Sequence, residues 1–284
     1  MTSIGGVTVG NKNTVKIMGI INVSPESFYK RSVRISEAEI AETAKGMQQD
    51  GAHMIDIGAM STAPYLETII SVEEEIRRIK YAIEVVKRAC RLPVSADTPR
   101  AKVAKEAIAA GVDVINDVTG LKYDAQMADE IARAKVPVII GAYSTNVTTG
   151  KIQGTLQALK ESIALARKAG VADSNIIVDP SIGFFRKEGK NQFFTKMADI
   201  SWYIRDIEIL RNLCKLFLLN KPLCISVSRK SFIGHLLNMQ SEEDRLVPSI
   251  ICEAIAVLNG ASIIRTHNVK ETVQALTMLQ LLSS

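Results

Sequence analysis

Eight short apolar runs are spread along this chain, and nearly every one ends at a polar side chain. Strands that read as continuous apolar runs are buried on both faces, and their alternation with helical segments makes them parallel. The pattern therefore predicts an α/β fold, a (β/α)8 TIM barrel. The runs are residues 16–21, 53–55, 93–96, 112–115, 136–142, 175–178, 223–227 and 261–264.

The polar residues that follow these runs are predicted to form one site. In a (β/α)8 barrel the carboxyl ends of all strands meet at one face, so residues far apart in the sequence become neighbours there. The strand ends carry Asn22, Asp56, Asp97, Asn116, Asp117, Tyr143, Ser144, Asp179, residues 228–230, Arg265 and His267.

The length of 284 residues is slightly more than the roughly 250 residues of a typical barrel, which leaves room for loops but not for a second large domain. We expect a single domain over residues 1–284, with residues 1–14 as an N-terminal lead-in. No apolar stretch approaches the length of about 18 residues that spans a bilayer, and residues 1–10 lack a secretory signal pattern. The expected location is the cytoplasm.

Composition excludes few partners. The net charge of +5 suits a small anionic substrate without requiring one, and an aromatic content of 5% with no recognisable motif argues against nucleic-acid binding. We expect neither a nucleic-acid nor a membrane partner. The four cysteines are widely scattered and form no C-x-x-C pair, so they indicate neither a zinc site nor a redox motif.

The sequence also predicts where several helices start. Ser36 with Glu39 fits a capping box, Thr98 followed by Pro99 fits an N-cap with proline at the first helical position, and Asn268 opens the last helix. We interpret these residues as stabilising features with no role in chemistry.

Asp97, Asn116 and Asp179 close three different strands, where short acceptors and an amide can bind a flat heterocycle that carries N–H and C=O groups. A buried carboxylate is costly unless it is paired, so two of them imply a ligand or a cation. Lys230 is the cation that we expect to pair with these carboxylates. A purely structural Asp–Lys network at the barrel top is an equal alternative.

Residues 228–231, Ser-Arg-Lys-Ser, supply hydroxyls and two cations at a helix start, which is typical of an anion site. A serine cap with exposed basic residues is the alternative. Arg265 and His267 are one residue apart, so on an extended segment they project to the same side and could bind the same phosphate or pyrophosphate.

Asn22 ends the first strand, which adjoins the eighth in a closed barrel. Its amide oxygen could ligate Mg²⁺ held mainly by phosphate oxygens, since Mg²⁺ takes few protein ligands and keeps several waters. An Asx-turn before Pro25 is the alternative.

Taken in order, eight motifs resemble those of the dihydropteroate synthase family over nearly the whole chain. The segment Ser-Arg-Lys-Ser-Phe-Ile-Gly at residues 228–234 is the most specific of them. The other motifs are residues 20–28, 55–58, 61–64, 95–98, 115–120, 179–184 and 265–267.

The resemblance implies an enzyme that joins 6-hydroxymethyl-7,8-dihydropterin pyrophosphate to p-aminobenzoate or a related arylamine, releases pyrophosphate, uses Mg²⁺ and forms a homodimer through barrel helices. It implies the following roles. The pterin would be held by Asp97, Asn116, Asp179 and Lys230. The pyrophosphate would be held by Asn22, Thr62, Arg265 and His267 beside Ser228, with Asn22 placing Mg²⁺, and the arylamine pocket would be lined by Phe184 and Ser231. The residues expected to take part in catalysis are Asp97, Asp179, Lys230, Arg265 and His267.

The loops at the mouth depart from the family pattern. Residues 26–32 lack the paired glycines, the loop arginine is replaced by Ala63 with Tyr65 two residues later, and the sixth strand is followed by Phe185 and Arg186 in place of Gly-Lys. Lys30, Arg31 and Arg34 are candidates to replace the lost arginine, although solvated charges are their more ordinary interpretation.

Three alternatives stay open at this point. A non-catalytic pterin-binding paralogue would keep the pocket without turnover. A methylpterin:corrinoid methyltransferase has no use for a pyrophosphate clamp. An unrelated lyase or aldolase would use Lys230 as an imine nucleophile.

Overall fold

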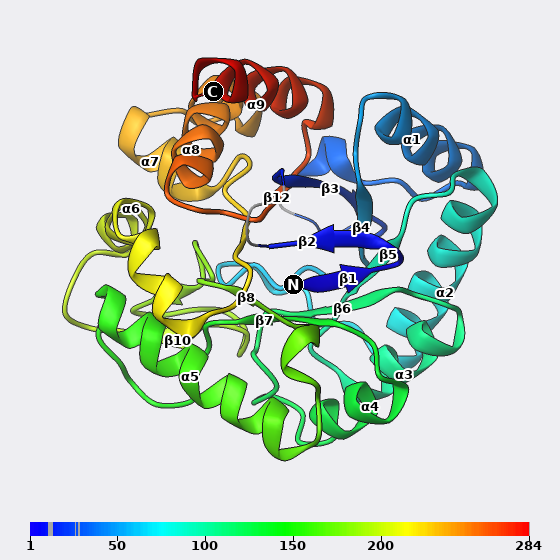
Figure 1. The fold of residues 1–284 in the computed structure, drawn as a ribbon, viewed down its shortest axis with the longest axis horizontal. Coiled ribbons are helices and arrows are strands. Elements are labelled where there is room, and N and C mark those ends of the chain that lie inside the picture. Colours follow the sequence, from blue (N-terminus) through cyan, green and yellow to red (C-terminus); the bar gives the residue numbers. More distant parts are fainter. Residues whose placement is uncertain (11–13, 26, 28, 284) are drawn as a thin grey trace.

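Eight parallel strands form one curved sheet that is nearly closed into a barrel, as the apolar runs predict (Figure 1). The computed structural model describes the chain except for residues 11–13, 26, 28 and 284. The strand order is β11-β12-β3-β4-β5-β6-β7-β8, and the two edges meet where the Val178 amide donates to the Pro222 carbonyl at 3.0 Å. The barrel strands are β3 (Lys16–Asn22), β4 (Met54–Gly58), β5 (Val94–Asp97), β6 (Val114–Asp117), β7 (Val138–Gly141), β8 (Ile176–Asp179), β11 (Cys224–Ile225) and β12 (Ile263–Thr266).

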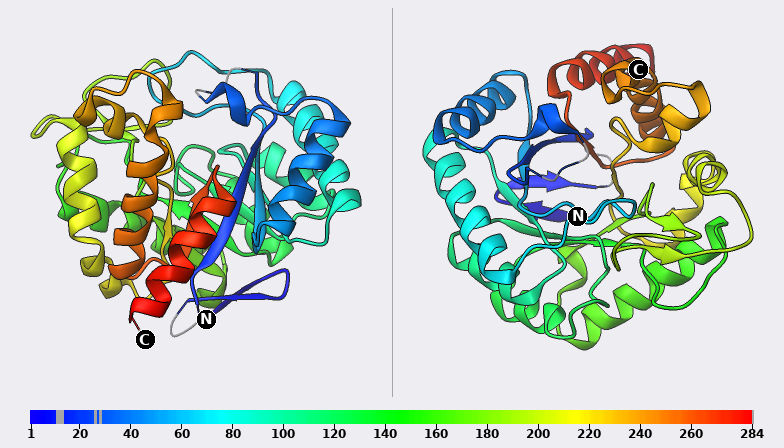
Figure 2. Two further views of the ribbon diagram at one scale, coloured as in Figure 1. Left: turned by 90° about the horizontal axis from the view of Figure 1, so that it is seen from above. Right: turned by 180° about the vertical axis from the view of Figure 1, so that it is seen from behind.

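Helices surround the sheet as an outer ring (Figures 1 and 2). Their apolar faces pack on the outer faces of the strands, which explains why the strands carry apolar residues on both sides. The α-helices are α1 (Glu37–Gln49), α2 (Val72–Ala89), α3 (Ala101–Ala109), α4 (Met127–Ala134), α5 (Ile152–Lys168), α6 (Trp202–Arg211), α7 (Ser231–Leu237), α8 (Leu246–Leu258) and α9 (Val269–Ser283). The 3₁₀ helices are η1 (Lys30–Ser32), η2 (Asp173–Asn175), η3 (Leu213–Leu219) and η4 (Glu242–Arg245).

The N-terminal lead-in forms a hairpin that covers the amino-terminal end of the barrel. Strands β1 (Thr2–Ile4) and β2 (Val7–Val9) pair antiparallel and cross the middle of the ring in Figure 1. Ile4 and Val9 are fully buried and belong to one apolar cluster with interior strand residues, among them Met18, Met54 and Ile177. The hairpin therefore fills this end of the barrel, and the site lies at the opposite end.

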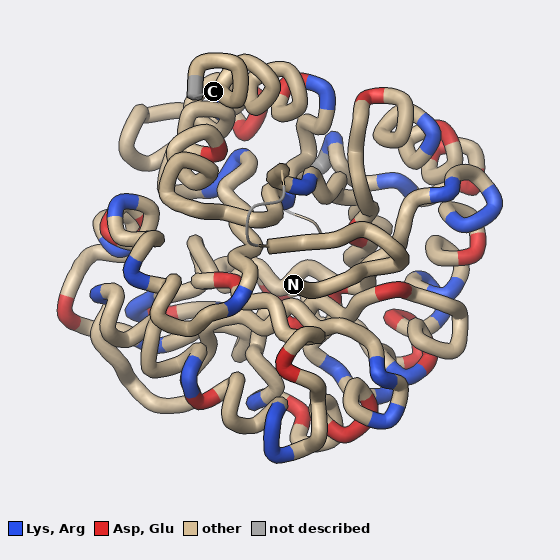
Figure 3. The backbone as a smooth tube through the Cα atoms, viewed as in Figure 1, with Lys and Arg blue, Asp and Glu red and all other residues tan. Residues whose placement is uncertain are grey.

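Charged residues of both signs are distributed along the outer helices, whereas α8 contains only Glu253 (Figure 3). Within the described residues, no helix combines the length and the apolar character that a membrane-spanning segment requires.

Candidate active site

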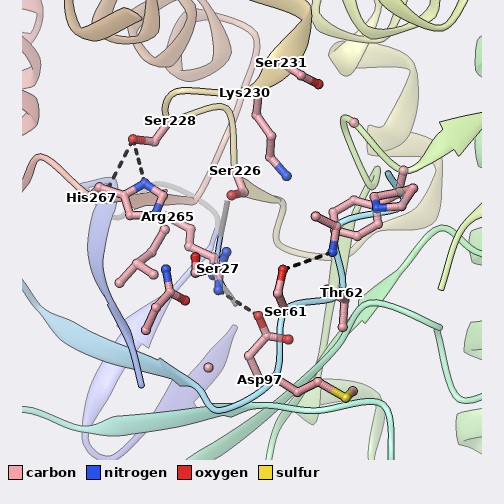
Figure 4. A pocket seen from close by; sticks show the side chains of 18 of the residues that line it. Ser27, Ser61, Thr62, Asp97, Ser226, Ser228, Lys230, Ser231, Arg265 and His267 are labelled. Atoms are coloured by element: carbon pink, nitrogen blue, oxygen red, sulfur yellow. Dashed lines mark hydrogen bonds and ion pairs between the residues drawn. The ribbon is translucent and has the colours of Figure 1, made fainter. Parts of the chain in front are cut away.

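Two adjoining cavities open at the carboxyl ends of the strands, and together they are lined by every residue to which the sequence analysis gives a ligand-binding role; Figure 4 shows one of them. The strand-end residues Asp56, Asp117, Tyr143, Ser144 and Arg229 line neither cavity. Thr62, Asp97, Phe184, Lys230 and Arg265 line both cavities. The first, the outer cavity, is also lined by Asn22, Ser228, Ser231 and His267, and the second, the inner cavity, by Asn116 and Asp179.

Strand register places three of the polar strand ends and one glycine in one row. Asn22 on β3 is the register partner of Gly58 on β4, which pairs with Asp97 on β5, which in turn pairs with Asn116 on β6. Because Gly58 has no side chain, the row leaves open space between Asn22 and Asp97. A Cβ atom at Gly58 would lie 3.1 Å from the Asn22 Oδ1.

Arg265, and not Lys230, is the cation that pairs with the carboxylates at the bottom of the cavity. Its Nη2 lies 2.7 Å from Asp97 Oδ2 and 2.5 Å from Asp56 Oδ2, and its Nε donates to the same Asp56 oxygen at 2.6 Å. The alternative of a structural Asp–Lys network is therefore not seen, since Lys230 forms no ion pair with a described carboxylate. Arginine fits this position because its planar fork can bind two carboxylates at once.

Asp56 is a site residue that the sequence analysis placed at a strand end but gave no role. It is completely buried, and within the described part of the chain its Oδ1 has no hydrogen-bond partner. The apolar run that ends at Asp56 is the signal that could have identified it. The strand continues to Gly58, so Asp56 lies inside the barrel one layer below its mouth.

The titration of the cavity groups reflects their burial. Burial raises the pKa of Asp97 to about 7, against the opposing effect of Arg265. Burial, followed by repulsion from Arg265, lowers the pKa of Lys230 to about 8. The Lys230 ammonium points into the cavity and lies 4.6 Å from the centre of the Phe184 ring; it forms no ion pair with any described residue (Figure 4). It is therefore available to bind a ligand acceptor.

Ser228 and His267 form a second polar group beside the first. The Ser228 Oγ accepts from the His267 backbone amide at 3.2 Å and lies 3.2 Å from its Nδ1 (Figure 4). Burial lowers the pKa of His267 well below its ordinary value, and Arg265, Arg229 and Lys230 lower it further. The imidazole is thus neutral near pH 7 and acts as a hydrogen-bonding group rather than a cation.

Arg229 does not belong to the anion site, contrary to the expectation of two cations there. Its side chain is buried, stacks on the Tyr29 ring at 4.8 Å and donates to Asn268 Oδ1 and to the carbonyls of Glu242 and Glu243. Arg229 thus connects the segments that carry Asn268, Glu242 and Glu243. Of Arg229 and Lys230, only Lys230 lines the cavity.

Asn22 has a free acceptor that fits a metal bound mainly by phosphate. Its Nδ2 donates to the Ser32 Oγ at 2.7 Å, while Oδ1 accepts no hydrogen bond from a described residue and faces Gly58. The described residues contain no cluster of three or more histidine, cysteine, aspartate or glutamate side chains that could hold a metal alone. Mg²⁺, which prefers few protein oxygens, suits this donor set.

Hydrogen bonds join two of the mouth loops, the one after β4 and the one after β9. Asn191 donates to the carbonyls of Ala63 and Leu66, and the Lys190 amide donates to the Pro64 carbonyl at 2.6 Å. In the loop after β3, Glu26, Phe28 and the side chain of Lys30 lie outside the described part of the structure.

Comparison with known proteins agrees with this arrangement. A family model for pterin-binding enzymes matches residues 18–267. A dihydropteroate synthase of Clostridium beijerinckii is 37% identical over 94% of this chain and 93% of its own length, and that of Bacillus subtilis is 34% identical over 94% and 88%.

The chain belongs to the dihydropteroate synthase family of pterin-binding enzymes.

Solved structures of dihydropteroate synthases share the fold. One from Clostridium difficile in the presence of pteroic acid has a TM-score of 0.83 at 32% identity and covers 97% of this chain and 99% of its own. One from Xanthomonas albilineans with 4-aminobenzoic acid has a TM-score of 0.82 at 29% identity and covers 96% and 94%. Membership of this family and the barrel fold, both predicted from the sequence, are confirmed.

Proposed function

We propose that the protein is a dihydropteroate synthase that condenses 6-hydroxymethyl-7,8-dihydropterin pyrophosphate with p-aminobenzoate and releases pyrophosphate. One observation carries the proposal: Asp97, Asn116, Asp179 and Lys230, which has no ion pair among the described residues, share a cavity that continues directly to Ser228 and His267. A heterocycle with N–H and C=O groups matches the first set, and an anion matches the second.

The inner cavity suits the pterin ring. Asp179 is a short acceptor whose Oδ1 already accepts from the Ser181 amide at 2.6 Å, which orients the carboxylate. Asn116 offers both a donor and an acceptor, and Lys230 can donate to a ring nitrogen or carbonyl. Asp97, fixed by Arg265, accepts from the ring on the opposite side.

The outer cavity suits the pyrophosphate. Arg265 keeps one donor, Nη1, that is unused among the described residues, and His267, Ser228 and Thr62 add uncharged donors. Asn22 would hold Mg²⁺ through its free Oδ1. When bound, Mg²⁺ supplies charge neutralisation to the pyrophosphate.

The reaction needs positioned charge and no nucleophilic side chain. The arylamine nitrogen forms a bond to the methylene carbon as the bond from that carbon to the pyrophosphate oxygen breaks, and the nitrogen then loses one proton. Arg265 stabilises the departing negative charge, and the Asp97 and Asp179 carboxylates favour the positive charge that develops on the pterin. Lys230 acts as a donor to the ring rather than as an imine nucleophile.

The direct test is incubation of the purified protein with Mg²⁺, the pterin pyrophosphate and p-aminobenzoate, followed by chromatographic detection of dihydropteroate. We expect product with the native protein and a loss of at least about tenfold in rate with Lys230→Met, since a charged hydrogen bond contributes that much. Pterin binding without product would contradict the proposal and favour a binding-only paralogue.

We further propose that the chain forms one domain and a homodimer, and that the protein works in the cytoplasm. Support for the dimer comes from a stripe of exposed apolar residues on α8. Val247, Ile251, Ile255 and Leu258 are each at least 42% exposed and recur at helical spacing. Such a stripe marks a surface that another copy of the chain would cover.

A further inference from the structure

Arg186 is a buried guanidinium without a carboxylate partner among the described residues. Only 7% of it is exposed, at the end of β9 (Phe185–Arg186), which pairs with β10 (Thr195–Lys196). Its Cζ lies 3.7 Å from the centre of the Trp202 ring and 5.7 Å from that of Tyr65. The nearby carboxylate of Asp206 attracts it, but Asp206 forms its ion pair with Arg205 at 3.2 Å. A charge buried in this way is costly unless an anion compensates it.

The hydrogen bonds of Arg186 point to the mouth of the cavity. Its Nε donates to the Gly183 carbonyl at 3.2 Å, and its Nη2 donates to the Ser231 Oγ at 2.8 Å. Gly183, Ser231 and Tyr65 all line the outer cavity. Arg186 therefore lies directly behind the cavity wall.

The hydrogen bond from Arg186 determines whether the Ser231 hydroxyl can donate its proton to a ligand. A hydroxyl has one proton to donate, and here its oxygen accepts from Arg186 while its proton has no acceptor among the described residues. The proton is therefore available to a ligand in the cavity, with a positive charge immediately behind it. An oxyanion is the ligand group that satisfies both features.

The other cations of the mouth are engaged elsewhere. Arg31 pairs with Glu243 at 3.1 Å, and Arg34 donates to the carbonyls of Arg31 and Val33. The position of the lost loop arginine is held by Ala63, whose neighbour Tyr65 lies against Arg186. Arg186 is thus the cation that lies next to Ser231 at the mouth, whereas Lys230 and Arg265 line the part of the cavity assigned to the pterin and the pyrophosphate.

We propose that Arg186 is a positioning residue that fixes Ser231 as the donor to the carboxylate of the arylamine, so that the enzyme selects an anionic arylamine over a neutral one. This inference rests on the proposed function and adds to it the residue that determines the choice of second substrate.

The test compares p-aminobenzoate with its neutral analogue 4-aminobenzamide in steady-state kinetics. With Arg186→Met we expect KM for p-aminobenzoate to rise about tenfold, while kcat changes by less than about twofold and the kinetics with the amide hardly change. The neighbouring exposed Lys187→Met removes the same charge and is the matched control; it should keep the native preference.

A double-mutant cycle separates this role from a merely structural one. Ser231→Ala should lose the same preference, and adding Arg186→Met to it should change KM by less than about twofold more, because the two residues act as one unit. Equal losses with both amines, or an unchanged preference in Ser231→Ala, would overturn the inference while the proposed function stands. Failure of the native protein to form dihydropteroate from either amine would overturn both.

Discussion

Arg265 holds two acidic side chains that would otherwise repel each other inside the barrel. Burial raises the pKa of Asp97 and of Asp179, so keeping these two carboxyl groups charged in the free protein costs free energy even beside Arg265. A ligand that donates hydrogen bonds to these carboxylates relieves that cost. The cavity is thus electrostatically prepared for a ring that presents N–H groups.

Asp179→Asn should weaken pterin binding, because an amide would present donors where the ring also presents donors. We expect the Kd of 6-hydroxymethyl-7,8-dihydropterin to rise at least about tenfold, which corresponds to one charged hydrogen bond. Isothermal titration calorimetry measures the Kd of the pterin for the native protein and for the variant. The matched control is Asp173→Asn, whose carboxylate pairs with Arg167 and Lys221 outside the cavity. An unchanged Kd in Asp179→Asn would remove Asp179 from the pterin site.

Lys230 gives the binding of pterin a pH dependence. Its pKa is lowered to about 8 in the free protein, so the ammonium that donates to the ligand is lost as the pH rises through 8. We expect the Kd to rise by up to about tenfold per pH unit above 8 and to level off below about 7.

Lys230→Met serves as the control for this pH dependence, since any titration of the ligand itself affects both proteins. The ratio of the two Kd values, measured between pH 6.5 and 9.5, should therefore fall toward one at high pH. A ratio that does not vary with pH would show that the ammonium does not bind the pterin.

The residues at strand ends could be predicted because a strand end fixes where a side chain lies. Asp97, Asn116 and Asp179 needed only the apolar runs and the closure of the barrel. The partners of Arg265 and the burial of Arg186 could not be predicted, since they depend on which way long side chains turn once distant loops have packed.

At the scale of elements, helix starts were predicted with mixed success. Ser36 and Glu39 form the capping box at α1 as expected. The start at Thr98 is wrong: α3 begins at Ala101 with Arg100 as its N-cap, although the Thr98 hydroxyl accepts from the Arg100 amide at 3.3 Å while it donates to Glu75 at 2.6 Å. Asn268 precedes α9, but its Oδ1 accepts from Arg229. Tertiary hydrogen bonds compete for the same short side chains, and sequence spacing does not reveal them.

Helix α8 carries a buried glutamate whose protonation affects stability. Glu253 is fully buried, its Oε2 accepts from the Thr272 hydroxyl at 2.7 Å, and its Oε1 has no partner among the described residues. Burial raises its pKa from 4.5 to about 7. The folded protein thus holds this proton more tightly than the unfolded chain, and the contribution of Glu253 to stability falls as the pH rises from about 4.5 to about 7.

Glu253→Gln removes this dependence. We expect the free energy of unfolding of the variant, relative to the native protein, to increase between pH 5 and pH 8 by up to about 3 kcal/mol. Urea unfolding at the two pH values measures it, and the exposed Glu84→Gln on α2 is the matched control. A difference that stays constant with pH would contradict the assigned titration.

At the scale of the molecule, the amino-terminal hairpin and α8 show two ways of covering apolar surface. The hairpin covers the interior of the barrel within the chain, whereas the stripe on α8 has no cover within the described residues. The barrel could be predicted from the alternation of runs and helices. The hairpin could not, because residues 2–9 form two strands too short to be recognised by their pattern.

Ile251→Glu tests the proposed homodimer. A charge at the centre of the α8 stripe should convert the dimer to a monomer, because an unpaired buried carboxylate is costly at an apolar interface. Sedimentation velocity measures the mass, and Ile69→Glu, at an exposed position outside α8, is the control. A native protein that sediments as a monomer would contradict the proposal.

The central claim is that the cavity transfers a pterin group to an arylamine as it releases pyrophosphate. The most direct measurement follows pyrophosphate and dihydropteroate in the same samples, with Mg²⁺, the pterin pyrophosphate and p-aminobenzoate present. We predict that the two products form at equal rates, and that both rates fall together in Lys230→Met. Pyrophosphate released without dihydropteroate, or neither product despite measured pterin binding, would contradict the claim.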